Sequence, residues 1–274
     1  MKRKIFDAVW TYVLLIAIGF IFLFPCLWLV LASFSDSGSI YSFKGFSPSS
    51  FSLNSFKTLF TDTTMYNYPL WFKNTLFIAV MNCVIGTMLV ILTAYIMSRC
   101  RFKMRKALMR TTLVLGMFPS FMSMIAVYIL MTQFNLINNH WGLILIYSSG
   151  TPMGYMVQKG FFDTIPYSID EAAQIDGANS FTVFTKIALP LSLPMLFYTA
   201  LTSFAWPWSD FILPKLLLKQ KDLYTVAVGL MSLGETEFSR YAAGSVFIAV
   251  PIVILFFCLT KFLVNGLSAG SVKE

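Results

Sequence analysis

The stretch TTLVLGMFPSFMSMIAVYILMTQFNLINNHWGLILIYSSGTPMGYMVQ, residues 111–158, contains no Asp, Glu, Lys or Arg. A helix needs about 20 apolar residues to cross the hydrocarbon core of a bilayer, so these 48 residues are long enough for two crossings. Four further stretches lack charge and are each long enough for one crossing: 8–35, 74–98, 187–209 and 241–260. The sequence therefore predicts six membrane spans.

The composition of the whole chain agrees with this pattern. Of 274 residues, 57% are hydrophobic and 12% are charged, with a mean hydropathy of +0.74. A soluble domain carries about 25% charged residues. The composition excludes an ordinary globular enzyme, a disordered chain and a nucleic-acid-binding domain.

The placement of the basic residues predicts the orientation of the chain. With both termini inside, 13 of the 20 Lys and Arg residues lie in cytoplasmic segments and seven lie outside. This is the asymmetry expected of a chain oriented N-in and C-in. The net charge of +8 is therefore a membrane signal, because no folded domain exists to gather these cations into a nucleic-acid-binding face. The densest group joins spans 2 and 3: Arg99, Arg101, Lys103, Arg105, Lys106 and Arg110.

The predicted fold class is all-α, a polytopic membrane protein with one transmembrane domain over residues 1–274. The first uncharged stretch, Ala8–Ser35, exceeds the 7–15-residue apolar region of a signal peptide and is interpreted as a retained span. The six spans are expected at about 12–34, 71–98, 107–131, 141–162, 191–213 and 242–263.

The segment between spans 4 and 5, residues 166–190, is too polar to cross the membrane and predicts two short helices joined by a hinge. Ser168 and Glu171 have the spacing of a capping box, which starts a helix. Gly177 then ends this helix and offers a hinge with positive φ. The second helix is expected to start at Asn179 or Ser180 and to end at Pro190.

This segment resembles the EAA loop of the membrane permease subunit of bacterial ATP-binding-cassette importers. The matching residues are Glu171-Ala172-Ala173, Gly177 and Ile187-x-Leu189-Pro190. Further stretches resemble the carbohydrate-uptake branch of that family: Asp176-Gly177-Ala178, Leu53-Asn54-Ser55-Phe56, Phe72-Lys73-Asn74-Thr75-Leu76 and Ala94-Tyr95-x-x-Ser98-Arg99-x-Arg101-Phe102. The length and the six spans are most similar to the smaller permease of the maltose/maltodextrin type.

The resemblance implies a multi-pass subunit of the bacterial cell membrane with several partners. These are a second permease subunit, two cytosolic ATPase subunits and an extracellular or periplasmic sugar-binding protein. The residues implied in ATPase coupling are Glu171, Ala172, Ala173, Asp176, Gly177, Ile187, Leu189 and Pro190. A simpler interpretation makes Gly177 only a helix C-cap and Glu171 only the partner of Ser168, and the two interpretations are compatible.

Several kinds of chemistry are missing from the chain. It has no G-x-x-x-x-G-K-[ST] loop and no Gly-Lys pair, so ATP and Mg²⁺ are expected on a partner ATPase. We expect no catalytic, cofactor-binding or metal-binding residue in this chain, which is a transport subunit and not an enzyme. The acidic residues of the 161–191 segment are interpreted as a solvated face and not as a metal site: Asp163, Asp170, Glu171 and Asp176.

No ionisable residue lies deep in a predicted span, which argues against a proton-driven or sodium-driven carrier. Neutral polar side chains suit a hydroxyl-rich solute. They equally suit hydrogen bonding between helices. The candidate pathway residues are Asn82, Tyr95, Tyr128, Tyr155, Tyr198 and Ser203.

The outer segment 214–241 has two interpretations. By resemblance it reaches the sugar-binding protein, with contact residues Gly229, Met231, Ser232 and Gly234 forming a turn with a small hydrophobic tip. An ordinary solvated loop is the alternative.

Three functions remain after these exclusions. The first is a permease that imports a sugar, such as a maltodextrin, by alternating access driven by an ATPase. The second is a stand-alone channel or scaffold whose cytoplasmic helix pair binds another partner. The third, a polytopic membrane enzyme, is disfavoured because no buried His, Asp or Glu is available.

Overall fold

The computed structural model describes residues 2–35, 38–39, 51–150 and 152–271, and every element within them is helical. An all-α fold is thus confirmed for this part of the chain. In chain order the elements are α1 (Lys2–Ser33), α2 (Asn54–Thr61), α3 (Tyr68–Arg99), α4 (Arg105–Gly116), α5 (Ser120–Gln133), α6 (His140–Ser148), α7 (Pro152–Thr164), α8 (Tyr167–Ile175), α9 (Ser180–Val183), η1 (Phe184–Ala188), α10 (Leu189–Leu191), α11 (Leu193–Ser209), α12 (Ile212–Leu217), η2 (Lys221–Leu223), α13 (Val226–Met231), η3 (Glu235–Glu237) and α14 (Phe238–Ser271). Element η1 is a π-helix, whereas η2 and η3 are 3-10 helices.

Three helices are long and apolar enough to cross a membrane, by length and composition: Val9–Ser33 of α1, all of α3, and Phe238–Thr260 of α14. Two bent helix pairs raise this number to as many as five. Six spans therefore stay a prediction. The apolar window of α1 has no residue buried within the chain, whereas 44% of that of α3 is buried.

The predicted third, fourth and fifth spans differ from the structure, because none is one uninterrupted helix. Helices α4 and α5 meet at 108°, and Pro119 precedes α5 in an extended conformation that a continuous helix does not allow. Gly150, with φ of +73°, separates α6 from α7. Helix α11 ends before Asp210, whose carboxylate accepts from the N–H of Ile212 at 3.1 Å and starts α12.

The chain divides into two compact units, residues 1–69 with 229–250 and residues 70–228 with 251–274. The prediction of a single domain is not decided by this division. In the first unit, the Tyr68 hydroxyl donates to the carbonyl of Gly244 at 2.9 Å, and Arg240 pairs with Asp62 at 3.3 Å. Aromatic contacts join α2 to α14, including Phe60 against Phe247 at 4.9 Å.

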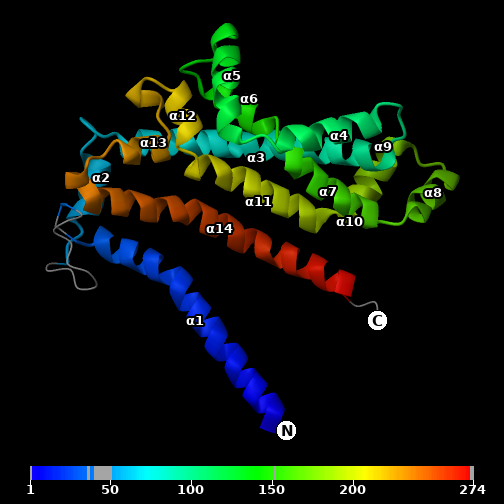
Figure 1. Ribbon diagram of the computed structural model, residues 1–274, viewed down its shortest axis with the longest axis horizontal. Coiled ribbons are helices and arrows are strands. Elements are labelled where there is room, and N and C mark those ends of the chain that lie inside the picture. Colours follow the sequence, from blue (N-terminus) through cyan, green and yellow to red (C-terminus); the bar gives the residue numbers. More distant parts are fainter. Residues whose placement is uncertain (1, 36–37, 40–50, 151, 272–274) are drawn as a thin grey trace. The chain divides into compact units, whose positions relative to one another are not determined.

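In the second unit, α11 runs alongside α3, and most of the shorter helices lie toward one end of α3 or the other (Figure 1). Helices α5, α6 and α12 lie toward its beginning, while α4 and α7 to α10 lie toward its end (Figure 1). The segment 221–226 is fixed on the first turns of α3. Trp71 Nε1 donates to the Lys221 carbonyl at 2.8 Å, and the Thr75 hydroxyl accepts from the Val226 N–H at 2.8 Å. These contacts hold an otherwise irregular segment in place.

We expect Gly142→Ala to destabilise the second unit. A Cβ at this buried position of α6 would lie 2.6 Å from the carbonyl oxygen of Leu136. That oxygen belongs to a loop held by two hydrogen bonds, from the Leu136 N–H to the Met131 carbonyl at 2.8 Å and from the Asn138 N–H to the Leu217 carbonyl at 3.0 Å, so it cannot move freely. Overpacking of this kind costs about 1–3 kcal/mol.

The thermal unfolding midpoint of the purified chain in detergent measures this cost. Gly160→Ala is the matched control, because nothing lies within 4 Å of an added Cβ in α7. A midpoint for Gly142→Ala at or above that of the control would contradict the close approach.

Candidate coupling site

Two short helical segments joined at Gly177, here called the elbow (residues 166–191), form the candidate site. Helix α8 begins at Tyr167 with Pro166 as its N-cap, and no side chain caps it. The predicted capping box is therefore wrong, because Ser168 is already the second residue of the helix. Proline fixes its own φ near the helical value and cannot continue a helix in the N-terminal direction, so α8 starts directly after Pro166. The helix ends where Gly177 has φ of +88°, which confirms the predicted positive-φ hinge.

The second half of the elbow starts as the sequence predicts. The Asn179 side chain accepts a hydrogen bond from the Thr182 N–H at 2.8 Å and caps α9. The chain then passes through η1 and α10 and meets α11 at an angle of 79°. The structure thus has short helical segments on either side of Gly177, with a bend at each end of the second half.

An apolar cluster holds this second half on the ends of α3 and α7. Ala188 is buried together with Ile91 and Phe162, and Phe184 packs on Tyr95 with ring centroids 4.7 Å apart. Of the predicted coupling residues, Ile187 and Leu189 are half-buried and Pro190 is exposed. The second half is anchored through one side only.

The opposite side of the elbow is exposed and partly apolar. Ile175 is 86% exposed and Phe181 is 73% exposed, and the two residues lie on either side of the hinge. The predicted coupling residues Glu171, Ala172, Asp176 and Gly177 are exposed as well, and Ala173 is half-buried. Hydropathy did not single out Ile175, because its neighbours Gln174 and Asp176 are polar. Large exposed apolar side chains rimmed by polar ones are typical of an interaction surface.

Asp170 corrects the prediction of a uniformly solvated acidic face. It is buried, and its carboxylate lies 3.1 Å from Nε of Arg99 at the end of α3. Asp163 is paired with Lys159 in α7. Burial raises the pKa of the Asp163 carboxyl, but hydrogen bonds from Lys159 and Ser98, with nearby positive charge, more than offset this and hold its pKa below the ordinary value. Among the described residues, no three His, Cys, Asp or Glu side chains are placed to share a metal ion.

The candidate pathway residues occupy different environments. Asn82 is buried in α3, where its amide donates to the Ser203 carbonyl of α11 at 2.6 Å. Tyr95 and Tyr155 pack on the apolar cluster below the elbow. Tyr198 is exposed on α11. Of the six candidates, Asn82 and Ser203 are joined directly, by the hydrogen bond between α3 and α11.

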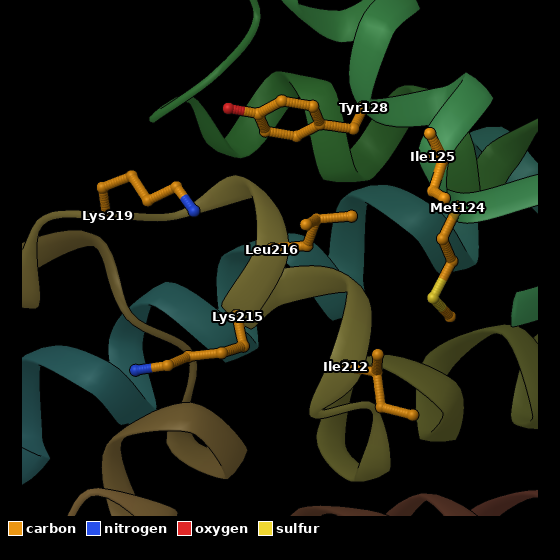
Figure 2. Close-up of a pocket in the computed structure, with 7 residues that line it drawn as sticks. All are labelled: Met124, Ile125, Tyr128, Ile212, Lys215, Leu216 and Lys219. Carbon is orange, nitrogen blue, oxygen red and sulfur yellow. The ribbon is translucent and has the colours of Figure 1, made fainter.

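Tyr128 is the candidate pathway residue that lines a pocket. Figure 2 shows this pocket, of about 530 Å³, between α5 and the segment around α12. Its wall is mainly apolar: Met124, Ile125, Tyr128, Ile212, Lys215, Leu216 and Lys219. The Lys219 ammonium lies 5.8 Å from the centre of the Tyr128 ring, and Lys215 points away from that ring (Figure 2). No pattern in the sequence points to this pocket, because its walls come from separate segments.

The predicted contact loop of the outer segment is more helical than expected. Gly229 and Met231 belong to α13, Ser232 lies in the turn that follows, and Gly234 precedes η3. The Ser232 hydroxyl donates to the Gly229 carbonyl at 2.6 Å. Met231 is exposed and Leu233 is buried, so the apolar tip is one side chain wide.

Comparison with known proteins adds a family and several relatives. Residues 86–270 match the family described as binding-protein-dependent transport system inner membrane component. The maltodextrin transport system permease protein MalD of Streptococcus pneumoniae is 36% identical, with 100% of this chain and 98% of that protein covered. The galactooligosaccharides transport system permease protein GanQ of Bacillus subtilis is 36% identical, with 99% of this chain and 97% of that protein covered. The maltose/maltodextrin transport system permease protein MalG of Salmonella typhimurium is 34% identical over 74% and 72%.

A solved structure supports the fold. It is that of a bacterial ABC transporter involved in the import of the acidic polysaccharide alginate. One of its chains superimposes with a TM-score of 0.76 at 20% identity, and 96% of this chain and 98% of that chain are covered. At this identity the likeness extends to the fold alone.

Proposed function

Because the chain belongs to the binding-protein-dependent transport system inner membrane component family, we propose that it is the permease subunit of an ATP-driven sugar importer. Its place is the bacterial cell membrane, which the apolar helices α1, α3 and α14 suit. The observation that carries the proposal is the elbow, a polar helix pair with a fixed positive-φ hinge and an exposed, partly apolar face.

The exposed face of the elbow docks on a cytosolic ATPase. Ile175 and Phe181 offer two apolar anchors, and short amphipathic helices bind grooves through such anchors. Glu171 precedes both anchors, four residues before Ile175 in α8, and belongs to none of the four ion pairs formed by the described residues. A cation on the ATPase would form an ion pair with the Glu171 carboxylate, and this contact would fix the register of docking.

The complex has four kinds of subunit in this proposal. Two ATPases bind ATP and Mg²⁺, because this chain has no phosphate-binding loop. A second permease completes the pathway, and an external binding protein delivers the substrate. Closure of the ATPases moves the elbows, and the attached helices alternate the cavity between the two sides of the membrane.

The proposed substrate is an oligosaccharide of the maltodextrin class. The named relatives transport maltodextrin, galactooligosaccharides or maltose, each at 34–36% identity. The uncharged character of the predicted spans suits a neutral, hydroxyl-rich solute.

We expect a photo-crosslinker at residue 175 to capture an ATPase. The four native cysteines, Cys26, Cys83, Cys100 and Cys258, are first replaced. Ile175→Cys is then labelled with benzophenone maleimide and irradiated in membranes, and the adduct is identified by mass spectrometry. Met231→Cys, also exposed, is the control on the predicted outer side.

The expected adduct at residue 175 contains a nucleotide-hydrolysing protein, and the control adduct does not. Capture of another copy of this chain, or of no ATPase at all, would overturn the proposal and favour a channel or scaffold.

A further inference from the structure

A buried ion pair joins the elbow to the end of α3. Nε of Arg99 lies 3.1 Å from Oδ2 of Asp170, and their side chains are only 5% and 9% exposed. Arg99 is the last residue of α3, whereas Asp170 lies in the first turn of α8. The two residues are separated by the whole of α4 to α7 in sequence. Their contact therefore fixes the position of α8 against a helix to which it has no direct chain connection.

Three further contacts surround this pair. Nη2 of Arg99 donates to the Ile165 carbonyl at 2.9 Å, and the guanidinium carbon lies 4.4 Å from the centre of the Tyr167 ring. The Tyr167 hydroxyl also contacts α3, because it donates a hydrogen bond to the Ser98 carbonyl at 2.7 Å. A planar guanidinium can pair and stack at once, which lysine cannot do. The side chain of Arg99 thus holds both the segment that enters α8 and α8 itself.

Helix α7 joins the same group of residues. The Ser98 hydroxyl donates to the Asp163 carboxylate at 2.6 Å, and Lys159 pairs with the other oxygen of Asp163. Polar contacts of defined direction therefore connect the ends of α3 and α7 with α8. The second half of the elbow, by comparison, is held by the apolar cluster, whose contacts have no preferred direction.

Stability alone is a poor explanation for the pair. Oδ1 of Asp170 and both Nε and Nη1 of Arg99 are buried and have no hydrogen-bond partner among the described residues, so the contact between Nε and Oδ2 is an ion pair without hydrogen-bond geometry. A pair that served stability best would be bidentate. Burial of two charges with incomplete hydrogen bonding often contributes little net stability compared with apolar residues of similar size. What such a pair does supply is one defined orientation.

We propose that Arg99 is a positioning residue: it fixes the rotation of α8 about its axis, so that Glu171 and Ile175 face outward while α8 moves as one body with α3 and α7. Asp170 and Glu171 are adjacent, and helix geometry places adjacent side chains about 100° apart. Burying Asp170 therefore sets the direction of Glu171. The proposal rests on the proposed function, because it concerns how movement of the elbow enters the membrane helices.

The first test removes one charge at a time. Arg99→Gln and Asp170→Asn in the reconstituted importer should each lower sugar uptake by about tenfold or more, since each leaves the opposite charge buried and α8 free to rotate. Stimulation of ATP hydrolysis by the binding protein should fall in parallel, while the ATPase still co-purifies. Arg101→Gln removes the same charge from an exposed residue two positions away and should transport normally.

The second test separates positioning from stability. In the double variant Arg99→Met/Asp170→Leu, two apolar side chains replace the pair, which is expected to restore the thermal unfolding midpoint and subunit assembly. Apolar contact does not fix the rotation of α8, so uptake should stay low. A double variant that regains uptake together with stability would overturn the proposal, and so would one that fails to assemble. Wild-type uptake by Arg99→Gln would overturn it as well.

The outcomes also distinguish this inference from the proposed function. If the wild-type chain neither co-purifies with an ATPase nor shows stimulated ATP hydrolysis, the proposed function fails. If the wild-type importer is stimulated and the Arg99 variants are stimulated equally, only the positioning role of Arg99 fails.

Discussion

Replacing Gly177 with proline is expected to abolish sugar uptake and the stimulation of ATP hydrolysis, while the chain still inserts into the membrane. Gly177 has φ of +88°, whereas a proline ring holds φ near −65°, a difference of about 150°. Proline also removes the Gly177 N–H, which donates to the Gln174 carbonyl at 3.0 Å. The two halves of the elbow cannot then keep their relative direction, so Ile175 and Phe181 would no longer meet one surface.

A graded series at the same position isolates the backbone effect. Nothing lies within 4 Å of an added Cβ at Gly177, so alanine and asparagine act there through φ, and proline acts through φ and the lost N–H. Alanine pays about 1–2 kcal/mol for a left-handed conformation, and asparagine tolerates that conformation better. Uptake should therefore decrease in the order Gly, Asn, Ala, Pro. Gly160→Ala is the control and should transport normally. A proline variant as active as the wild type would show that no fixed hinge is needed.

The elbow was predictable from sequence because its signals are local. Pro166, Gly177 and Asn179 each set the backbone within a few residues, and the structure has a helix start, a hinge and a cap at those positions. The capping box failed for a local reason too, since Pro166 starts the helix one residue before Ser168.

The Arg99–Asp170 pair was not predictable in the same way. In the sequence, Arg99 belongs to a motif and is one of several basic residues that orient the chain. From the sequence alone Asp170 resembles the solvated acids beside it, because its burial depends on what packs against α8 in space. The available sequence signal is that Arg99 carries a charge directly after the long uncharged stretch 74–98, but this does not identify the residue that pairs with it.

The sequence also does not show whether each predicted membrane span is one uninterrupted helix. Hydropathy reports how many apolar residues are available, not whether one helix contains them. Pro119 and Gly150 interrupt the third and fourth predicted spans, and Asp210 ends the fifth early. Residues that line a translocation pathway are harder still to predict from sequence, because a cavity is formed by side chains from several helices. Of the six candidates, only Tyr128 lines the described pocket.

Glu171→Lys is expected to eliminate uptake as completely as the proline at residue 177, through the partner and not through the fold. Glu171 is exposed and follows the buried Asp170, so its substitution removes no contact that holds α8 in place. A lysine would oppose the cation proposed on the ATPase, and like charges brought together at a docking surface cost several kcal/mol. We expect the purified chain to keep its thermal unfolding midpoint and to lose co-purification with the ATPase.

Three further changes separate the effect of losing the Glu171 charge from the effect of reversing it. Glu171→Gln keeps the shape without the charge and should retain part of the uptake, because Ile175 and Phe181 still dock. Asp222→Lys makes a comparable charge reversal at an exposed residue near the other end of α3 and should leave co-purification with the ATPase unchanged. An acidic replacement of the facing cation on the ATPase should restore uptake to the Glu171→Lys importer. Restoration identifies a direct pair, since a variant that had merely misfolded would not respond to a change in another polypeptide.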